Sequence, residues 1–79
     1  MEIKLGSIVE TLVEKEEKEF GDQIIRLKKG LIGTVCDTEH IKDGWVYVEF
    51  NDETILKNGS GVYAYDTSEL KILEAFSLV

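Results

Sequence analysis

Residues 28–35 of the chain read Lys28-Lys29-Gly30-Leu31-Ile32-Gly33-Thr34-Val35. Two lysines precede the first glycine, two apolar residues follow it, and a second glycine leads into two β-branched residues. Glycine accepts a positive φ, and the close approach of another backbone, without the steric cost that a side chain brings. The pattern therefore predicts a turn that leads into a tightly curved strand, as in a small β-barrel.

Outward from this segment, five stretches have the β-branched or alternating character of strands. They cover residues 8–13, 31–36, 45–50, 62–65 and 71–73. The third has the clearest period of two, so we expect Val46, Val48 and Phe50 to face the core. Trp45 and Tyr47 then face solvent.

The connections between these strands are charged, polar or rich in glycine. The charge density of residues 14–22 leaves no core face, so we expect a long solvated loop or at most one helical turn. Residues 37–44 end in Asp43-Gly44, a pair that suits the turn before a hairpin strand. Residues 51–61 are expected to form a flexible connection, and residues 66–70 one short helical turn.

Length and composition favour one small domain over residues 1–79, with its core at about 6–73 and an apolar tail at 74–79. Sixteen acidic and nine basic residues give a formal net charge of −7, which disfavours nonspecific binding of nucleic acid. The chain shows neither a signal-peptide core nor a run of apolar residues that could span a membrane. We therefore expect a cytosolic protein with no membrane partner.

The order of these elements resembles the SH3-like barrel superfold over about residues 6–73. The resemblance implies an all-β fold: a single barrel of about five strands with one short helical turn. The segment Lys29-Gly30-Leu31-Ile32-Gly33-Thr34-Val35 resembles the KOW motif of ribosomal proteins and transcription elongation factors. The layout is also similar to small bacterial domains of unknown function that carry a Lys-Gly-x-x-Gly-Thr-Val signature followed by a Val-Glu-Phe strand.

A second resemblance is to Src-homology peptide-binding domains, in which a tryptophan opens the third strand after Asp-Gly. Trp45 matches that position. Those domains usually carry a proline in the fourth strand, and this chain contains none. The missing proline argues against recognition of polyproline segments.

Aromatic and acidic residues suggest a surface that binds a protein partner. The aromatic platform is expected to consist of Trp45, Tyr47, Tyr63 and Tyr65, and the acidic loop beside it of Glu14, Glu16, Glu17 and Glu19. The platform would stack on a peptide or a nucleobase, and the loop would hold a basic group or, together with Asp22, imitate a line of phosphates. The alternative is structural: the aromatics pack across strands, and the acids form a solvated loop.

Arg26, Lys28 and Lys29 are candidate RNA-binding residues, since the KOW-like segment implies phosphate contacts near the Gly30 turn. Cys36 and His40 are four residues apart, but without two further ligands they complete no zinc site. No nucleophile has an evident base, and Cys36 is expected in the core. We therefore expect no metal, no cofactor and no enzymatic activity.

These features together predict a noncatalytic, acidic, SH3-like binding module that engages a basic surface of a protein partner. An inhibitor of the phage type or an immunity factor would fit this description. One alternative is a KOW-like RNA-associated or ribosome-associated protein. The other is an oligomeric small-ligand-binding protein or enzyme accessory subunit, in which the tail at 74–79 joins identical chains.

Overall fold

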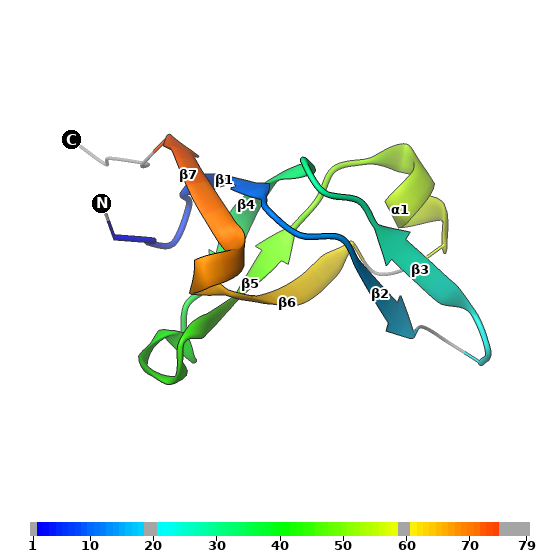
Figure 1. Ribbon diagram of the computed structural model, residues 1–79, viewed down its shortest axis with the longest axis horizontal. Helices are drawn as coiled ribbons and strands as arrows, with labels where there is room; N and C mark the ends of the chain where they lie inside the picture. The colour runs from blue at the N-terminus through cyan, green and yellow to red at the C-terminus, as the bar shows by residue number, and fades with distance from the viewer. Residues whose placement is uncertain (1, 19–20, 59–60, 75–79) are drawn as a thin grey trace.

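The computed structural model describes residues 2–18, 21–58 and 61–74 (Figure 1). Within these ranges the strands are β1 (Ile8–Thr11), β2 (Lys15–Lys18), β3 (Ile24–Leu27), β4 (Ile32–Asp37), β5 (Trp45–Glu49), β6 (Val62–Asp66) and β7 (Leu70–Glu74). Two 3₁₀ turns, η1 (Ile41–Asp43) and η2 (Thr67–Glu69), and one short helix, α1 (Glu53–Asn58), connect them. The fold is all-β, as expected from the sequence.

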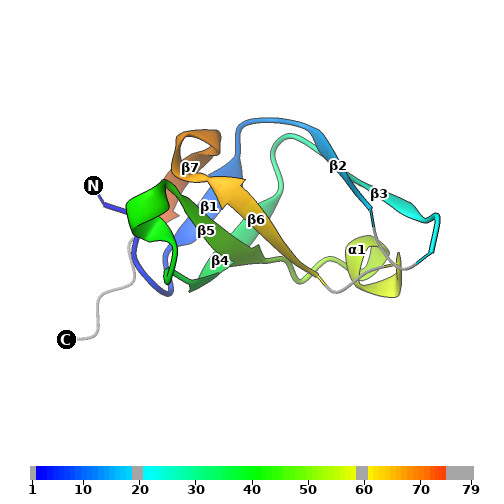
Figure 2. The ribbon, with the colours of Figure 1, turned by 90° about the horizontal axis from the view of Figure 1, so that it is seen from below.

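Five of the strands form an antiparallel sheet in the order β6-β5-β4-β1-β7, and β2 pairs with β3 in a separate hairpin. The last strand thus returns to lie beside the first, an order compatible with a small β-barrel-like fold. In both views the hairpin and α1 lie at one end of the molecule, whereas η1 and the start of the chain lie at the other (Figures 1 and 2). The five strands expected from the sequence are the five strands of the main sheet.

A positive φ at Gly30 and a close approach of another strand at Gly33 were expected for residues 28–35, and the structure shows both. Gly30 has a φ of +90°. At Gly33, a Cβ atom would lie 2.6 Å from Val48 Cγ1 and 2.8 Å from the carbonyl oxygen of Glu49. The backbone of β5 therefore approaches Gly33 too closely for any side chain to fit there.

Thr11 fixes the turn to β1. Its side chain is fully buried, and its hydroxyl donates a hydrogen bond to the Lys28 carbonyl oxygen at 3.0 Å. The same hydroxyl accepts one from the Leu31 amide at 3.0 Å. A buried hydroxyl with both a donor and an acceptor partner is fully compensated for the loss of water.

The prediction of a solvated loop at residues 14–22 is wrong at residues 15–18. These residues form β2, which pairs with β3 in antiparallel register. Side chains alternate along β2, so Lys15 and Glu17 are partly buried, whereas Glu16 is exposed and pairs with Arg26. Ile25 and Leu27 of β3 carry the apolar contacts of the hairpin into the core. The pairing with β3 thus compensates for the missing apolar face of β2.

The prediction of a flexible connection at residues 51–61 is also wrong at residues 53–58, which form α1. The Asp52 carboxylate accepts a hydrogen bond from the Ile55 amide at 3.3 Å, which caps the first turn. Ile55 is only 4% exposed and belongs to the core cluster. A local cap and one buried side chain are enough to hold this short helix in place.

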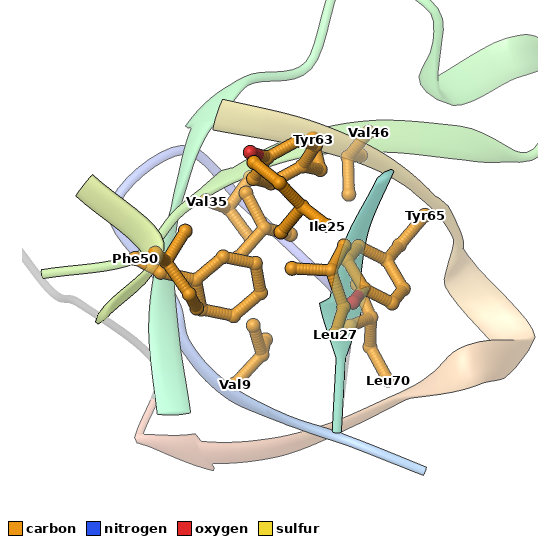
Figure 3. Packing of buried hydrophobic residues seen from close by; sticks show 11 residues of the cluster. Val9, Ile25, Leu27, Val35, Val46, Phe50, Tyr63, Tyr65 and Leu70 are labelled. Atoms are coloured by element: carbon orange, nitrogen blue, oxygen red, sulfur yellow. The ribbon is translucent and has the colours of Figure 1, made fainter. Parts of the chain in front are cut away.

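The core lies between the main sheet and the β2–β3 hairpin (Figure 3). Its buried hydrophobic residues are Val9, Ile25, Leu27, Val35, Val46, Val48, Phe50, Ile55, Tyr63, Tyr65 and Leu70. The inward face predicted for Val46, Val48 and Phe50 is confirmed, since all three are at most 1% exposed. No helix in the described part of the chain is long and apolar enough to cross a membrane.

Cys36 was expected in the core and is exposed instead. The register of β4 against β5 shifts between Val35, which pairs with Val48, and Asp37, which pairs with Tyr47. Cys36 falls inside this irregularity, where the alternation of inward and outward side chains is interrupted. The apolar tail expected to continue from β7 lies outside the described residues from position 75 onward.

Candidate partner-binding site

Three aromatic rings gather where the β4–β5 connection enters β5. His40 stacks on Trp45 with the ring centroids 4.2 Å apart and the planes 6° from parallel. Tyr47 meets Trp45 edge to face, at 5.1 Å and 83°. Trp45 and Tyr47 are both partly exposed, as predicted for the outer face of this strand. We refer to His40, Trp45 and Tyr47 as the aromatic cluster.

Tyr63 and Tyr65 do not join this cluster, which corrects the predicted four-residue platform. They are 5% and 1% exposed and belong to the core (Figure 3). The reason is the register of β6 against β5, in which Tyr65 pairs with Val46 and Tyr63 with Val48. Paired residues on antiparallel strands point to the same face, here the core face.

A shallow hollow of about 250 Å³ lies beside Trp45. Its lining comes from Lys15, Trp45, Ala64, Tyr65, Asp66 and Glu69. The pairing of β5 with β6 sets Trp45 opposite Asp66, and η2 then brings Glu69 to the same place. The Glu69 carboxylate accepts a hydrogen bond from the Asp66 amide at 2.8 Å, which fixes its position. We call this feature the Trp45 hollow.

Lys15 connects the hairpin to this hollow. Its Nζ atom donates a hydrogen bond to the Ala64 carbonyl oxygen and lies 3.7 Å from the centroid of the Tyr65 ring. The Glu69 and Glu17 carboxylates lie 3.7 and 3.8 Å from the same Nζ atom. Lys15 is therefore held by a carbonyl, an aromatic face and two carboxylates, and its charge is more than balanced.

Tyr65 forms the floor beneath Lys15. Burial raises the pKa of its hydroxyl above the usual range, and the carboxylates of Glu69 and Glu17 add to the effect. The hydroxyl oxygen is buried and has no hydrogen-bond partner among the described residues. Tyr65 therefore remains neutral at physiological pH and contributes its ring rather than a charge.

The predicted acidic residues do not form one surface. Glu17 lies beside Lys15, whereas Glu14 and Glu16 pair with Arg26 at 3.5 and 3.2 Å. Since side chains alternate along β2, Glu16 points away from the face that Lys15 and Glu17 share. Glu19 lies outside the described residues. Of the four acids, only Glu17 is placed beside the hollow.

The candidate RNA-binding residues are not gathered into one cationic patch. Arg26 is paired with two carboxylates, which offset its charge. Lys28 and Lys29 are exposed and directly precede Gly30 in the chain. The small hollow that Arg26 and Lys28 share also contains Asp52. Acidic side chains thus lie near Arg26 and Lys28, namely Glu14, Glu16 and Asp52.

Cys36 shows no sign of an activated thiol. Its Sγ atom donates a hydrogen bond to the Tyr47 carbonyl oxygen at 3.6 Å. Burial and, after it, the negative charge of Glu49 raise the pKa of the thiol above its usual value, which lowers the share of reactive thiolate at neutral pH. Across residues 2–18, 21–58 and 61–74, no three His, Cys, Asp or Glu side chains are grouped so as to hold a metal ion.

Four charged or aromatic residues of this region were missed in the prediction of a binding surface: Lys15, His40, Asp66 and Glu69. Asp66 and Glu69 carried a usable signal, because a helical turn between two strands places side chains three apart on one side. His40 carried none, since the four residues 41–44 separate it from Trp45. Protein-family models, curated proteins and solved structures contain no significant match to this chain.

Proposed function

We propose that this protein is a noncatalytic binding module whose Trp45 hollow takes a basic side chain from the surface of a protein partner. The observation that carries the proposal is the presence of a pre-oriented indole, Trp45, and two carboxylates, Asp66 and Glu69, in one hollow. Indole faces attract cations, and carboxylates form charge-assisted hydrogen bonds with Lys and Arg.

Charge in and around the hollow favours a cation despite the presence of Lys15. One positive side chain, Lys15, is accompanied by three negative ones, Glu17, Asp66 and Glu69. Lys15 Nζ is already directed at Ala64 and Tyr65, so it does not repel an incoming cation from the Asp66 side as a free ammonium would. The formal net charge of −7 adds a long-range attraction toward a basic surface.

The RNA-binding alternative has less support, because Arg26 forms ion pairs with Glu14 and Glu16 and its charge is therefore offset. An acidic inhibitor or an immunity factor remains a suitable biological setting for the proposed module. In that setting the module would act by occupying a basic surface of its partner, and the Trp45 hollow would supply the aromatic and acidic contacts.

Affinity capture with matched variants tests the proposal. Wild type, Trp45→Ala, Asp66→Asn and the double variant Lys28→Ala/Lys29→Ala are used as bait in a nuclease-treated lysate of the cells that express the protein. We expect one protein to be retained by the wild type and by the double lysine variant and to be lost with the other two. Asn keeps the ability of Asp66 to start η2, so its effect reports charge.

Two outcomes would contradict the proposal. Recovery of RNA before nuclease treatment, lost in the double lysine variant, would support the KOW-like alternative instead. Retention of the same protein by Trp45→Ala and wild type would mean that the Trp45 hollow is not the binding site.

A further inference from the structure

A second and larger hollow lies on the other side of η2. It has a volume of about 630 Å³, and its apolar lining comes from Ile3, Ile41, Leu70 and Ile72. Ile41 is 37% exposed in this position, although it is apolar. We call this feature the Ile41 groove. Glu2, Lys42, Thr67 and Ser68 complete the lining, so apolar and polar residues contribute equally to it.

The geometry of η2 explains why the two hollows are neighbours. A 3₁₀ turn has three residues per turn, so side chains at i and i+3 stand one above the other. Asp66 and Glu69 accordingly line the Trp45 hollow, whereas Thr67 and Ser68 line the Ile41 groove. A single turn of chain separates the two.

The β4–β5 connection and the first residue of β5 also contribute side chains to the two hollows. The Thr67 amide donates a hydrogen bond to the Gly44 carbonyl oxygen at 2.9 Å, which joins the end of η1 to the start of η2. Ile41, before this joint, lines the groove, and Trp45, after it, lines the hollow. The hydrogen bond between Thr67 and Gly44 therefore lies between residues that line the groove and residues that line the hollow.

The two hollows differ in charge. The Trp45 hollow has an excess of carboxylates, whereas Glu2 and Lys42 at the edge of the Ile41 groove offset each other. A balanced rim over an apolar floor favours an uncharged, apolar side chain. Adjacent sites with different preferences select a segment that carries both kinds of residue.

We infer that the Ile41 groove holds an apolar side chain of the same partner segment whose basic side chain lies beside Trp45. This inference rests on the proposed function and adds the chemistry of the ligand: a short extended segment with Lys or Arg followed or preceded by an aliphatic residue. A helical turn with its side chains is about 10 Å across, and an extended chain advances about 3.3 Å per residue. Because the side chains of an extended chain alternate between two faces, the two residues of the ligand are an even number of positions apart, about two or four.

Selection from a random twelve-residue peptide library displayed on phage tests this inference. The baits are wild type, Ile41→Gln and Asp66→Asn, with Ile24→Gln and Asp22→Asn as controls, because both control residues are exposed on the hairpin or its turn. Circular dichroism first verifies that all variants fold. The affinity of one peptide selected on wild type is then measured from the fluorescence of Trp45, the single tryptophan of the chain.

We expect wild type to select peptides with Lys or Arg and an aliphatic residue at a constant spacing. Ile41→Gln should lose the aliphatic preference, keep the basic preference, and bind the selected peptide about tenfold more weakly. Asp66→Asn should lose the basic preference and keep the aliphatic preference. The two controls should behave as wild type.

The outcomes that overturn the inference differ from those that overturn the proposed function. A basic preference with no aliphatic preference, or unchanged binding in Ile41→Gln, would refute the role of the groove and leave the proposed function standing. Loss of any basic preference, or failure to recover peptides, would refute both. A chain that ends at Glu74 should bind equally well; stronger binding would mean that residues 75–79 of the chain, and not the partner, occupy the groove.

Discussion

His40 and Trp45 lie face to face, with ring centroids 4.2 Å apart and planes 6° from parallel. The stack joins the β4–β5 connection to the first residue of β5, and Tyr47 supports it from the side at 5.1 Å. Aromatic pairs of this kind contribute about 0.5–1.5 kcal/mol beyond the area that they bury. The indole is thus oriented before a partner arrives, which lowers the entropy lost on binding.

Replacement of His40 by Ala should release Trp45 without unfolding the protein. We expect a red-shifted emission from Trp45, faster quenching by acrylamide, and about fivefold weaker binding of the partner, which corresponds to about 1 kcal/mol. Fluorescence and titration measure these quantities. Glu39→Ala, an exposed neighbour in the same connection, is the control. Unchanged quenching in His40→Ala would show that the stack does not position the indole.

Gly33→Ala and Gly30→Ala should differ strongly in stability. At Gly33 the added Cβ would lie 2.6 Å from Val48 Cγ1 and 2.8 Å from a backbone oxygen of β5, so the sheet itself must move. We expect a loss of about 3 kcal/mol or more. At Gly30 the space is open and only the φ of +90° is unfavourable, so the expected loss is about 1–2 kcal/mol. Urea denaturation measures both, and equal losses would contradict the close approach.

The core face of β5 could be predicted from sequence, whereas that of β6 could not. Val46, Val48 and Phe50 alternate with residues that tolerate solvent, so the period of two identifies the inner face. Over the first four residues of β6, Tyr63 and Tyr65 alternate with Val62 and Ala64, and all four are apolar or aromatic. Only the register that pairs Tyr65 with Val46 decides the orientation, and register depends on contacts distant in sequence.

The Trp45 hollow was hidden from sequence for a similar reason. Lys15 lies within a run of charges that is typical of a solvated loop, and its partners Ala64, Tyr65 and Glu69 are about fifty residues away. A charged strand becomes recognisable only when its cross-strand neighbours are known. Trp45 itself could be predicted, because the residues Asp43-Gly44 before it and the alternation after it are local signals.

Tyr65→Phe should leave the protein as stable at neutral pH or more stable by about 1 kcal/mol. The hydroxyl of Tyr65 is buried with no hydrogen-bond partner among the described residues, so its removal abolishes a desolvation cost. Phe keeps the ring beneath Lys15 and the edge-to-face contact with Phe50 at 5.9 Å. Thermal and urea denaturation measure the change. A loss of more than about 1 kcal/mol would mean that the hydroxyl has a partner, such as a bound water.

The same residue should make the protein sensitive to alkaline pH. The pKa of Tyr65 is raised in the folded state, so above the ordinary value of 10.0 the unfolded chain loses a proton that the folded chain keeps. The free energy of unfolding should then fall by about 1.4 kcal/mol per pH unit as the pH rises above 10. The measurement is made in a Cys36→Ser background, because the thiol pKa is raised as well. Tyr65→Phe should abolish this slope, and a slope that persists in the variant would assign it to another group.

Lys15→Met should loosen the β2–β3 hairpin from the main sheet. The variant keeps the aliphatic stem but loses the hydrogen bond to the Ala64 carbonyl, the contact with the Tyr65 ring, and the ion pairs with Glu17 and Glu69. We expect about 1–2 kcal/mol of destabilisation, because the Ala64 carbonyl loses its partner in a partly buried position. Amide hydrogen exchange should accelerate in β2 and β3 before it does so in β4 and β5, since the hairpin would then depend more on the packing of Ile25 and Leu27. Lys18→Met is the matched control, because Lys18 lies on the same strand and is exposed. If both variants exchange at the same rate as wild type, Lys15 is a surface charge and not the connection between the two sheets.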